Sequence, residues 1–231
     1  MKFAIIAAGE GSRLAQEGVQ LPKPLVQLNG MAMIDRLIHI FAKNGAEEVV
    51  VIINNEVALT KEHLSKLEKT SEVPLRVIVK TTPSSMHSFF ELSQFLNDAP
   101  FCLTTVDTIF REDEFKAYIE AFKNTEADGM MAVTDYIDDE KPLYVATDEA
   151  LNITGFLDKS DCCRYISGGI YALKPVAIRT LERCMKEGQS RMRNFQRGLV
   201  DDGLRLKAWP MSKILDVDHA SDIAKAEDFL K

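Results

Sequence analysis

A glycine-rich segment near the start of the chain carries two cationic side chains. It runs from Ala7 to Arg13 as AAGEGSR and is followed by PKPL, which includes Lys23. Glycine tolerates positive φ, so the N–H groups of such a loop can approach phosphate oxygens closely. Arg13 can hold a phosphate through two hydrogen bonds, and Lys23 adds a second positive charge. The segment therefore predicts a binding site for a phosphorylated ligand.

Two well-known glycine-rich loops do not match this segment. The dinucleotide-binding pattern G-x-G-x-x-G requires glycine where the chain has Leu14. Its helix also follows at once, whereas Pro22 and Pro24 interrupt the next stretch here. The phosphate-binding loop of many ATPases ends in Gly-Lys-Ser or Gly-Lys-Thr, which the segment does not contain. A different kind of phosphate site is indicated.

The charge of the chain is acidic overall and basic only at its start. The 231 residues include 28 Lys and Arg and 35 Asp and Glu, which gives a formal net charge of −7. Residues 1–43 carry five basic and three acidic side chains. An acidic surface repels nucleic acids, so no nucleic-acid partner is expected. A small anion held near the start of the chain is compatible with this balance.

Apolar runs alternate with helical patterns along most of the chain. Strands are predicted at residues 3–8, 49–53, 75–79, 101–106, 130–134, 205–209 and 214–217. Helices are predicted at 33–41, 61–69, 86–96, 113–123, from Pro175 onward, at 194–200 and at 220–230. Ser84 or Ser85 is expected to start the third of these helices. The alternation predicts right-handed βαβ units and an α/β fold.

The segment 136–173 has a different texture. Acidic residues and Pro142 are followed by short β-like stretches at 144–146, 153–157 and 166–173. They are expected to form a small mixed β insertion beside the main sheet. Since no linker or repeat divides the sequence, residues 1–231 are expected to form one domain.

The glycine-rich segment together with Lys23-Pro24-Leu25 resembles the signature of the nucleotidyltransferases that make nucleoside-diphosphate sugars, and of the related phosphocholine cytidylyltransferases. The resemblance implies a Rossmann-like, GT-A-like fold with a mixed, mostly parallel sheet flanked by helices, and Mg²⁺ as the cofactor. It also implies catalytic roles for Arg13 on the leaving pyrophosphate and for Lys23 on the α-phosphate. The implied nucleotide-binding residues are Ala7, Ala8, Gly9, Gly11, Ser12 and Ser85.

Three aspartates are the candidate ligands of the metal ion. Asp107 follows the strand 101–106 and resembles the family's metal-binding aspartate, although Val106 stands where the family usually has glycine. Ligands collect at this edge of open α/β sheets. Asp216 and Asp218 resemble the family's second acidic segment, and alternation along a strand would point both to one side. Asp218 also precedes a helix and could cap it, so Asp216 is the preferred ligand of the two.

The insertion 136–173 is expected to bind the acceptor. The stretch Phe156 to Lys159 resembles the family's Phe-x-Glu-Lys-Pro, which implies that Lys159 binds the acceptor's phosphate. Aspartate and serine replace the glutamate and proline of that pattern. Gly169 lies in a stretch that resembles a strand lining the family's acceptor pocket, but glycine in a strand can equally mark a bulge.

The segment Thr82 to Ser88 departs from the family pattern of sugar nucleotidyltransferases. A Gly-Thr or Gly-Ala loop is common there, whereas this chain has a polar replacement that is closer in character to the phosphocholine enzymes. His87 in this segment is a further candidate for acceptor binding. The identities of the base and the acceptor are therefore left open.

The activity expected from the resemblance joins a nucleoside triphosphate to a phosphorylated small molecule and releases pyrophosphate. A sugar 1-phosphate is the leading acceptor, and a phosphocholine-like molecule is the second. A GT-A glycosyltransferase is an alternative that does not explain Arg13 with Lys23, and a weakened nucleotide-binding regulator is another. The four cysteines have no metal-binding spacing, and the apolar start is too short for a signal or membrane segment. A cytoplasmic protein is expected, and its oligomeric state is not specified.

Overall fold

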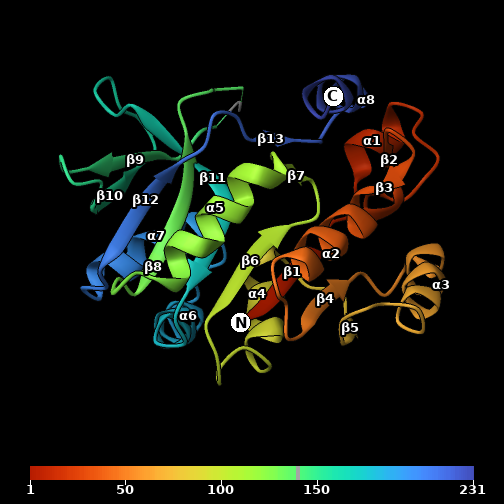
Figure 1. The fold of residues 1–231 in the computed structure, drawn as a ribbon, viewed down its shortest axis with the longest axis horizontal. Coiled ribbons are helices and arrows are strands. Elements are labelled where there is room, and N and C mark those ends of the chain that lie inside the picture. Colours follow the sequence, from red (N-terminus) through yellow and green to blue (C-terminus); the bar gives the residue numbers. More distant parts are fainter. Residues whose placement is uncertain (139–140) are drawn as a thin grey trace.

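The first half of the chain builds the parallel part of a nine-stranded sheet in the computed structural model, which describes residues 1–138 and 141–231 (Figure 1). Four strands run side by side in one direction, in the order β5 (Leu75–Val79), β4 (Val49–Ile53), β1 (Lys2–Ala7) and β6 (Phe101–Thr105). Nearly all residues of β1, β4 and β6 are buried. Apolar residues on both faces of these strands require helices on both sides of the sheet.

Each face of the sheet has its own hydrophobic core. Phe3 and Ile5 of β1 belong to one core, whereas Ala4 and Ile6 belong to the other, as alternation along a strand requires. The first core is covered by α2 (Met33–Lys43), α3 (Ala58–Leu67), α5 (Glu112–Lys123) and α8 (Ala220–Phe229). The second is covered by α4 (Ser85–Ser93), α6 (Ala177–Lys186) and α7 (Met192–Asp201). Figure 1 shows α2 and α5 crossing in front of the sheet.

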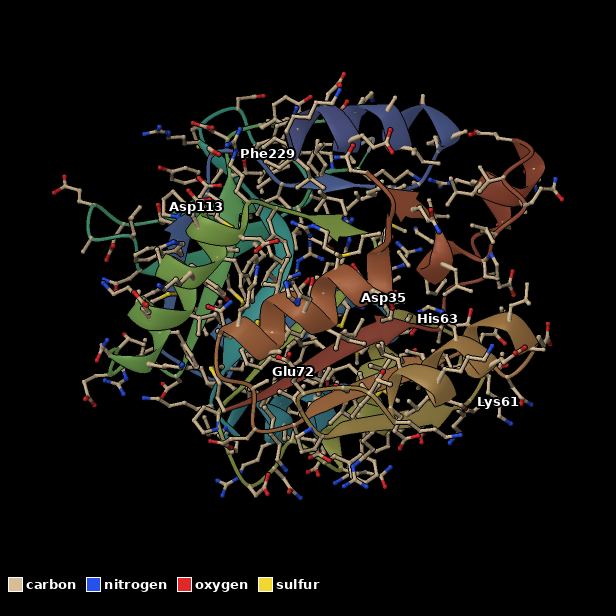
Figure 2. The ribbon with its side chains drawn as sticks, turned by 45° about the vertical axis from the view of Figure 1, so that its right-hand side comes forward. Asp35, Lys61, His63, Glu72, Asp113 and Phe229 are labelled. Carbon is tan, nitrogen blue, oxygen red and sulfur yellow. The ribbon has the colours of Figure 1, made fainter. Side chains whose placement is uncertain are left out.

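Polar contacts tie neighbouring helices of the first face together. His63 of α3 faces Asp35 of α2 with 2.6 Å between Nε2 and Oδ1, and Figure 2 shows the two side chains pointing toward each other. On α8, the ring of Phe229 lies 5.2 Å from the guanidinium carbon of Arg111 and 5.5 Å from Nζ of Lys213. Within the described residues, no helix is long and apolar enough to cross a membrane.

The second half of the chain makes the sheet mixed. Strand β11 (Tyr165–Leu173) lies between β6 and β8 (Gly129–Thr134) and is antiparallel to both, while β12 (Leu206–Pro210) pairs in parallel with β8. Strands β9 (Tyr144–Thr147) and β10 (Ile153–Leu157) are added beside the start of β11. The expected mixed, mostly parallel sheet with flanking helices is confirmed.

The expectation that residues 166–173 lie in an insertion beside the main sheet was wrong. These residues form most of β11, which is a central strand of the sheet. Strand β11 pairs with β8 both at its start and at its end. It also pairs with β9 at its start and with β6 at its end. A buried antiparallel strand and a buried parallel strand both appear as apolar runs, so the sequence pattern does not give the strand's direction or place.

Several short elements were not predicted. They are α1 (Ser12–Gln16), the 3₁₀ turn η1 (Lys23–Leu25), the hairpin of β2 (Gln27–Leu28) and β3 (Met31–Ala32), and β7 (Thr108–Ile109). Strand β13 (Leu215–Asp216) covers only part of the expected strand 214–217. At the top of Figure 1, α8 near the C-terminus lies beside α1 and the β2–β3 hairpin. Asn29 of this hairpin donates its N–H to Glu227 of α8 at 3.0 Å, so an early hairpin and the last helix are in contact.

Candidate active site

The glycine-rich segment leaves the carboxyl end of β1 as a tight loop. Ala7 and Ala8 are buried, whereas Gly9 is exposed and Ser12 begins α1. Gly11 has φ of 61°, and a Cβ added there would lie 2.9 Å from Cβ of Lys23. A side chain at Gly11 would therefore be strained by its backbone and would also collide with the root of the lysine. This glycine lets the loop and Lys23 pack directly against each other.

The ammonium group of Lys23 lies between two carboxylates. Its Nζ contacts Oδ2 of Asp107 and lies 2.7 Å from Oδ1 of Asp218. The lysine side chain is 11% exposed and that of Asp107 is 17% exposed, so the first contact is largely shielded from water. Burial by itself lowers the pKa of Lys23, but attraction and hydrogen bonding to Asp107 and Asp218 outweigh it and raise the pKa above its ordinary value. The lysine is held in its charged form.

Two short strands bring the carboxylates to this lysine. Asp107 follows β6, and the next two residues form β7, which pairs antiparallel with β13 so that Thr108 lies opposite Asp216. The N–H of Val217 donates to the carbonyl of Asp107 at 3.1 Å and extends this pairing toward Asp218. Residues far apart in the chain thus meet at the carboxyl edge of β1 and β6, where open α/β sheets bind their ligands.

A buried arginine ties the segment after Asp107 to α2. The guanidinium of Arg36 donates to the carbonyl of Phe110 and lies 5.3 Å from the centre of that ring. Burial lowers the pKa of Arg36 to about 10. The N–H of Met33, at the start of α2, also donates to the carbonyl of Val26 beside η1 at 3.0 Å. Helix α2 therefore contacts both the segment that follows Lys23 and the segment that follows Asp107.

Arg13 reaches the same cluster from α1, through a longer contact. Its Nη1 lies 3.5 Å from Oδ2 of Asp218, and the side chain is 56% exposed. Glu17 at the end of α1 accepts a hydrogen bond from the N–H of Ala220 at 2.6 Å and lies 2.7 Å from Nδ1 of His219. Arg13 is therefore carried on a short helix that is fastened to the start of α8.

The alternative role of Asp218 as a helix cap was wrong. His219 is the N-cap residue of α8, and its N–H donates to Asp222 at 2.9 Å. Asp218 instead pairs with Lys23 and Arg13. The one-residue difference matters because the last non-helical residue before α8 is His219, which leaves the Asp218 side chain free to face the sheet edge.

Asp216 and Asp218 line the same hollow of about 500 Å³, as expected from alternation along the strand. Of the two, Asp218 also contacts Lys23, at 2.7 Å between Oδ1 and Nζ. Among the residues that the structure describes, no three His, Cys, Asp or Glu side chains lie close enough together to hold a metal ion. The preference for Asp216 over Asp218 as a ligand stays a prediction.

The other wall of this hollow is formed by a bulge in β11. Ser167 lies opposite Val133, but Tyr171 lies opposite Met131, so two extra residues are accommodated between them. The bulge consists of Gly168 and Gly169, of which Gly168 lines the hollow. A Cβ on Gly168 would collide with Cδ1 of Ile214, whereas Gly169 has φ of 73° and lies near Thr108. The alternative interpretation of Gly169 as a bulge marker is thus confirmed.

Lys159 lies at a second hollow of about 830 Å³, next to the first. The neighbouring Asp158 pairs with two arginines of α7, at 2.5 Å from Nη1 of Arg193 and 2.8 Å from Nη2 of Arg197. Hydrogen bonds from Arg197 and then Arg193 lower the pKa of Asp158. Arg193 lines both hollows and connects them.

Arg193 and Arg197 were missed by sequence reasoning. Their spacing of four residues places both on one side of α7, where each can reach Asp158. Arginines at this spacing are also typical of a solvated helix face, so the pattern alone did not mark a site. A search for charged residues one helical turn apart near the start of a helix could have found them.

The structure places Ser85 and His87 in the first turn of α4, after β5. Ser84 is the N-cap residue, as expected, and its Oγ lies 2.8 Å from Nδ1 of His87. In the described part of the chain, neither Ser85 nor His87 lines the hollows that contain Arg13 and Lys159. The roles of these two candidates therefore stay predictions.

Solved structures of three other proteins share this fold over almost their whole length. The inositol-1-phosphate CTP transferase from T. maritima has a TM-score of 0.80 with 19% identity, covering 100% of this chain and 97% of that protein. A putative glucose-1-phosphate thymidylyltransferase from Bacillus anthracis has a TM-score of 0.85 with 18% identity, at 99% and 94% coverage. The CTP:phosphocholine cytidylyltransferase from Streptococcus pneumoniae has a TM-score of 0.74 with 18% identity, at 100% and 99% coverage.

Curated relatives are similar in sequence over most of this chain. Mannose-1-phosphate guanyltransferase 2 of Candida glabrata is 27% identical over 191 residues, which cover 79% of this chain and 52% of the relative. Mannose-1-phosphate guanyltransferase of Schizosaccharomyces pombe is 28% identical over 190 residues, with the same coverage. The chain thus spans about half the length of the curated relatives it matches.

The strongest assignment comes from the whole sequence. The sequence profile of a single family, described as Nucleotidyl transferase, matches residues 2–231. This range includes the glycine-rich loop, the lysine between two aspartates and the arginine pair of α7. The chain belongs to the nucleotidyl transferase family.

Proposed function

We propose that this chain transfers a nucleoside monophosphate from a nucleoside triphosphate to a sugar 1-phosphate and releases pyrophosphate. The observation that carries the proposal is the position of Lys23 between Asp107 and Asp218, beside the glycine-rich loop. A loop of backbone donors, a lysine and two carboxylates are the groups that a triphosphate and its metal ion require. The family membership and the mannose-1-phosphate guanyltransferase relatives support the same activity.

The triphosphate would lie along the glycine-rich loop. Backbone N–H groups around Gly9 and Gly11 would donate to phosphate oxygens, Lys23 would contact the α-phosphate, and Arg13 would stabilise the leaving pyrophosphate. A phosphate oxygen of the acceptor would then attack the α-phosphorus in line. Such an oxygen is already a good nucleophile at neutral pH, so positioning and charge neutralisation carry the reaction and no general base is required.

The carboxylates fit a divalent cation by their chemistry. Oxygens of Asp107 and Asp218 already converge on one positive charge, the ammonium of Lys23. Mg²⁺ is commonly held by one or two carboxylates together with phosphate oxygens and water, so a full set of protein ligands is not required. We assign Asp107 and Asp218 as its ligands, with Asp216 beside them. When bound, Mg²⁺ would neutralise charge on the triphosphate.

The acceptor would occupy the hollow between the two charged clusters. Arg193 lines this hollow and Lys159 lines the second hollow next to it, so both would provide positive charge for the phosphate from the side of α7. Tyr136 also lines this hollow, but Nζ of Lys213 lies 4.2 Å from the centre of its ring. A quaternary ammonium group would have to compete with this lysine for the aromatic face, which favours a sugar phosphate over phosphocholine. In this proposal the segment 136–173 supplies acceptor contacts, and its residues 139–140 lie outside the described residues.

The test is a matrix of four nucleoside triphosphates against sugar 1-phosphates, inositol 1-phosphate and phosphocholine, with pyrophosphate and nucleotide product measured together. We expect equal amounts of both products for one base with a sugar 1-phosphate. Turnover with phosphocholine and with no sugar 1-phosphate would show that phosphocholine is the acceptor. A parallel incubation with an intact nucleotide sugar that showed sugar transfer would indicate a glycosyltransferase. Nucleotide binding without any turnover would indicate a regulator. Either of these last two results would contradict the proposal.

A further inference from the structure

The position between Asp107 and Asp218 is already filled by a positive charge that belongs to the chain. Nζ of Lys23 contacts one oxygen of each carboxylate, and the lysine side chain is almost entirely buried. A metal ion placed between these two oxygens would lie close to the ammonium and would be repelled by its charge. A metal ion that arrives alone would therefore compete with Lys23 for the same two carboxylates.

The backbone and Cβ of Lys23 are fixed by packing, but its ammonium group is able to move. Cβ of Lys23 packs against Gly11, and η1 is held by the bond from the N–H of Leu25 to the carbonyl of Pro22 at 2.8 Å. Beyond Cβ, the side chain is a flexible chain of carbons with a strongly hydrated charge at its end. The ammonium can therefore turn from the carboxylates to a phosphate in the adjacent loop while the backbone stays in place.

A metal-bound triphosphate offers partners to both sides of this contact. Its phosphate oxygens provide a new counterion for the ammonium, and its metal ion provides a new counterion for Asp107 and Asp218. Neither the metal alone nor the triphosphate alone provides both. We propose that Lys23 is an exchangeable counterion, which occupies the cation position in the absence of substrate and makes the binding of metal and triphosphate depend on each other. The inference rests on the proposed function.

Arg13 provides a matched comparison within the same cluster. It also faces Asp218, but at 3.5 Å and with an exposed side chain, and its guanidinium is not shared with Asp107. Replacing either cation by glutamine removes one positive charge near Asp218. Only the replacement of Lys23 also vacates the position between the two carboxylates. Comparing the two variants therefore distinguishes the effect of vacating this position on metal affinity from the effect of removing one positive charge nearby.

The experiment measures binding of Mn²⁺ alone to the full chain by electron paramagnetic resonance, without nucleotide. We expect Lys23→Gln to bind Mn²⁺ at least about tenfold more tightly than the wild type, the change expected when one charge-assisted hydrogen bond no longer has to be broken. Arg13→Gln should change the affinity by less than about threefold, since exposed charges interact weakly. Equal affinities in the wild type and Lys23→Gln would overturn the proposal, and so would equal tightening in both variants.

Two further measurements show whether the variants are folded and whether the proposed function is correct. Mn²⁺ should raise the unfolding temperature of Lys23→Gln more than that of the wild type, because ligands stabilise the state that binds them, and Lys23→Met should behave in the same way. If the wild type releases pyrophosphate but Lys23→Gln binds Mn²⁺ no more tightly than the wild type, the proposed counterion role of Lys23 is wrong and the proposed function stands. A change in Mn²⁺ affinity without pyrophosphate release from any substrate pair would overturn only the proposed function.

Discussion

Two charged clusters at the same edge of the sheet have opposite polarity. In the first, one cation, Lys23, lies between two carboxylates. In the second, one carboxylate, Asp158, lies between two guanidinium groups. The first cluster joins three distant parts of the chain. Its Lys23 and Asp107 are mostly buried and its Asp218 is 46% exposed. The second cluster joins two neighbouring elements and leaves Asp158 57% exposed.

The lysine cluster is held in place by the fold around it, whereas the arginine cluster is held mainly by ion pairs at the surface. Breaking a buried ion pair leaves an uncompensated charge away from water, which is costly. Exposed pairs contribute little and are screened by salt. Changes in the lysine cluster should therefore reduce the reaction strongly, and changes in the arginine cluster should mainly alter the affinity for the acceptor.

The largest expected effect comes from Asp107→Asn. The variant keeps the size of the side chain but removes the charge that faces Lys23 and the proposed metal ion. We expect kcat/KM to fall about 100-fold or more, as when one electrostatic group of a catalytic site is removed. Pyrophosphate release with the best substrate pair measures this. Asp201→Asn at the end of α7 is the matched control. Similar turnover in both variants would show that the charge of Asp107 is not required for the reaction.

The second effect comes from Gly11→Ala. The added Cβ would meet Cβ of Lys23 at 2.9 Å, on a residue whose φ is positive. The loop and the lysine would have to move apart, and we expect kcat/KM for the triphosphate to fall about tenfold or more because a small displacement is costly in a positioned site. Gly155→Ala in β10 is the control, because no atom lies within 4 Å of a Cβ there. A kcat/KM equal to that of the control would contradict the packing of the loop on Lys23.

The sequence identified the members of the lysine cluster but not their contacts. Lys23, Asp107 and Asp218 each stand in a motif or at the end of a predicted strand. Their meeting depends on η1, β7 and β13, which are two or three residues long. Elements of this length have no periodicity to detect, and their pairing is decided by tertiary contacts.

The arginine cluster was less accessible to prediction for a related reason. Lys159 was predicted from the resemblance, but Arg193 and Arg197 lie on an amphipathic helix, where charged residues usually face water. Which of them faces a hollow depends on how α7 packs against β10. The direction of β11, and hence the wall formed by Gly168, likewise depends on strand pairing that buried apolar runs do not encode.

A smaller effect is expected from Arg197→Met. This arginine pairs with Asp158 at 2.8 Å and donates to the carbonyl of Phe156 at 3.1 Å, so it holds the segment that carries Lys159. We expect KM for the acceptor to rise about three- to tenfold with little change in kcat, because the pair is partly exposed. Initial rates at varied acceptor concentration measure this. Arg179→Met on α6 is the control. A large loss of kcat with unchanged KM would assign Arg197 to the reaction step instead.

The smallest effect concerns the pair that fastens α1 to α8. The hydrogen bond with Glu17 raises the pKa of His219 above its ordinary value of 6.5, and the same bond lowers the pKa of Glu17 below 4.5. The stabilisation from His219 is complete below pH 6.5 and is lost as pH rises through its raised pKa. The stabilisation from Glu17 is present above pH 4.5 and is lost as pH falls through its lowered pKa.

Thermal unfolding of the wild type and His219→Gln over a range of pH measures this pair. The difference between their unfolding temperatures should be largest near pH 5 to 6, between the two pKa values, and should shrink toward alkaline pH. Glu62→Gln removes an exposed pair with a lysine, so its difference from the wild type should stay constant over that range. A difference for His219→Gln that grows with rising pH would contradict the charged pair.

The location of the triphosphate and its metal ion is tested most directly by a crystal structure with Mn²⁺ and a non-hydrolysable analogue of the triphosphate that supports turnover. The anomalous signal of manganese should lie between Asp107 and Asp218, with Nζ of Lys23 turned onto a phosphate oxygen. Manganese and phosphates bound instead at the cluster of Asp158, Arg193 and Arg197, with Lys23 still between its carboxylates, would contradict the account.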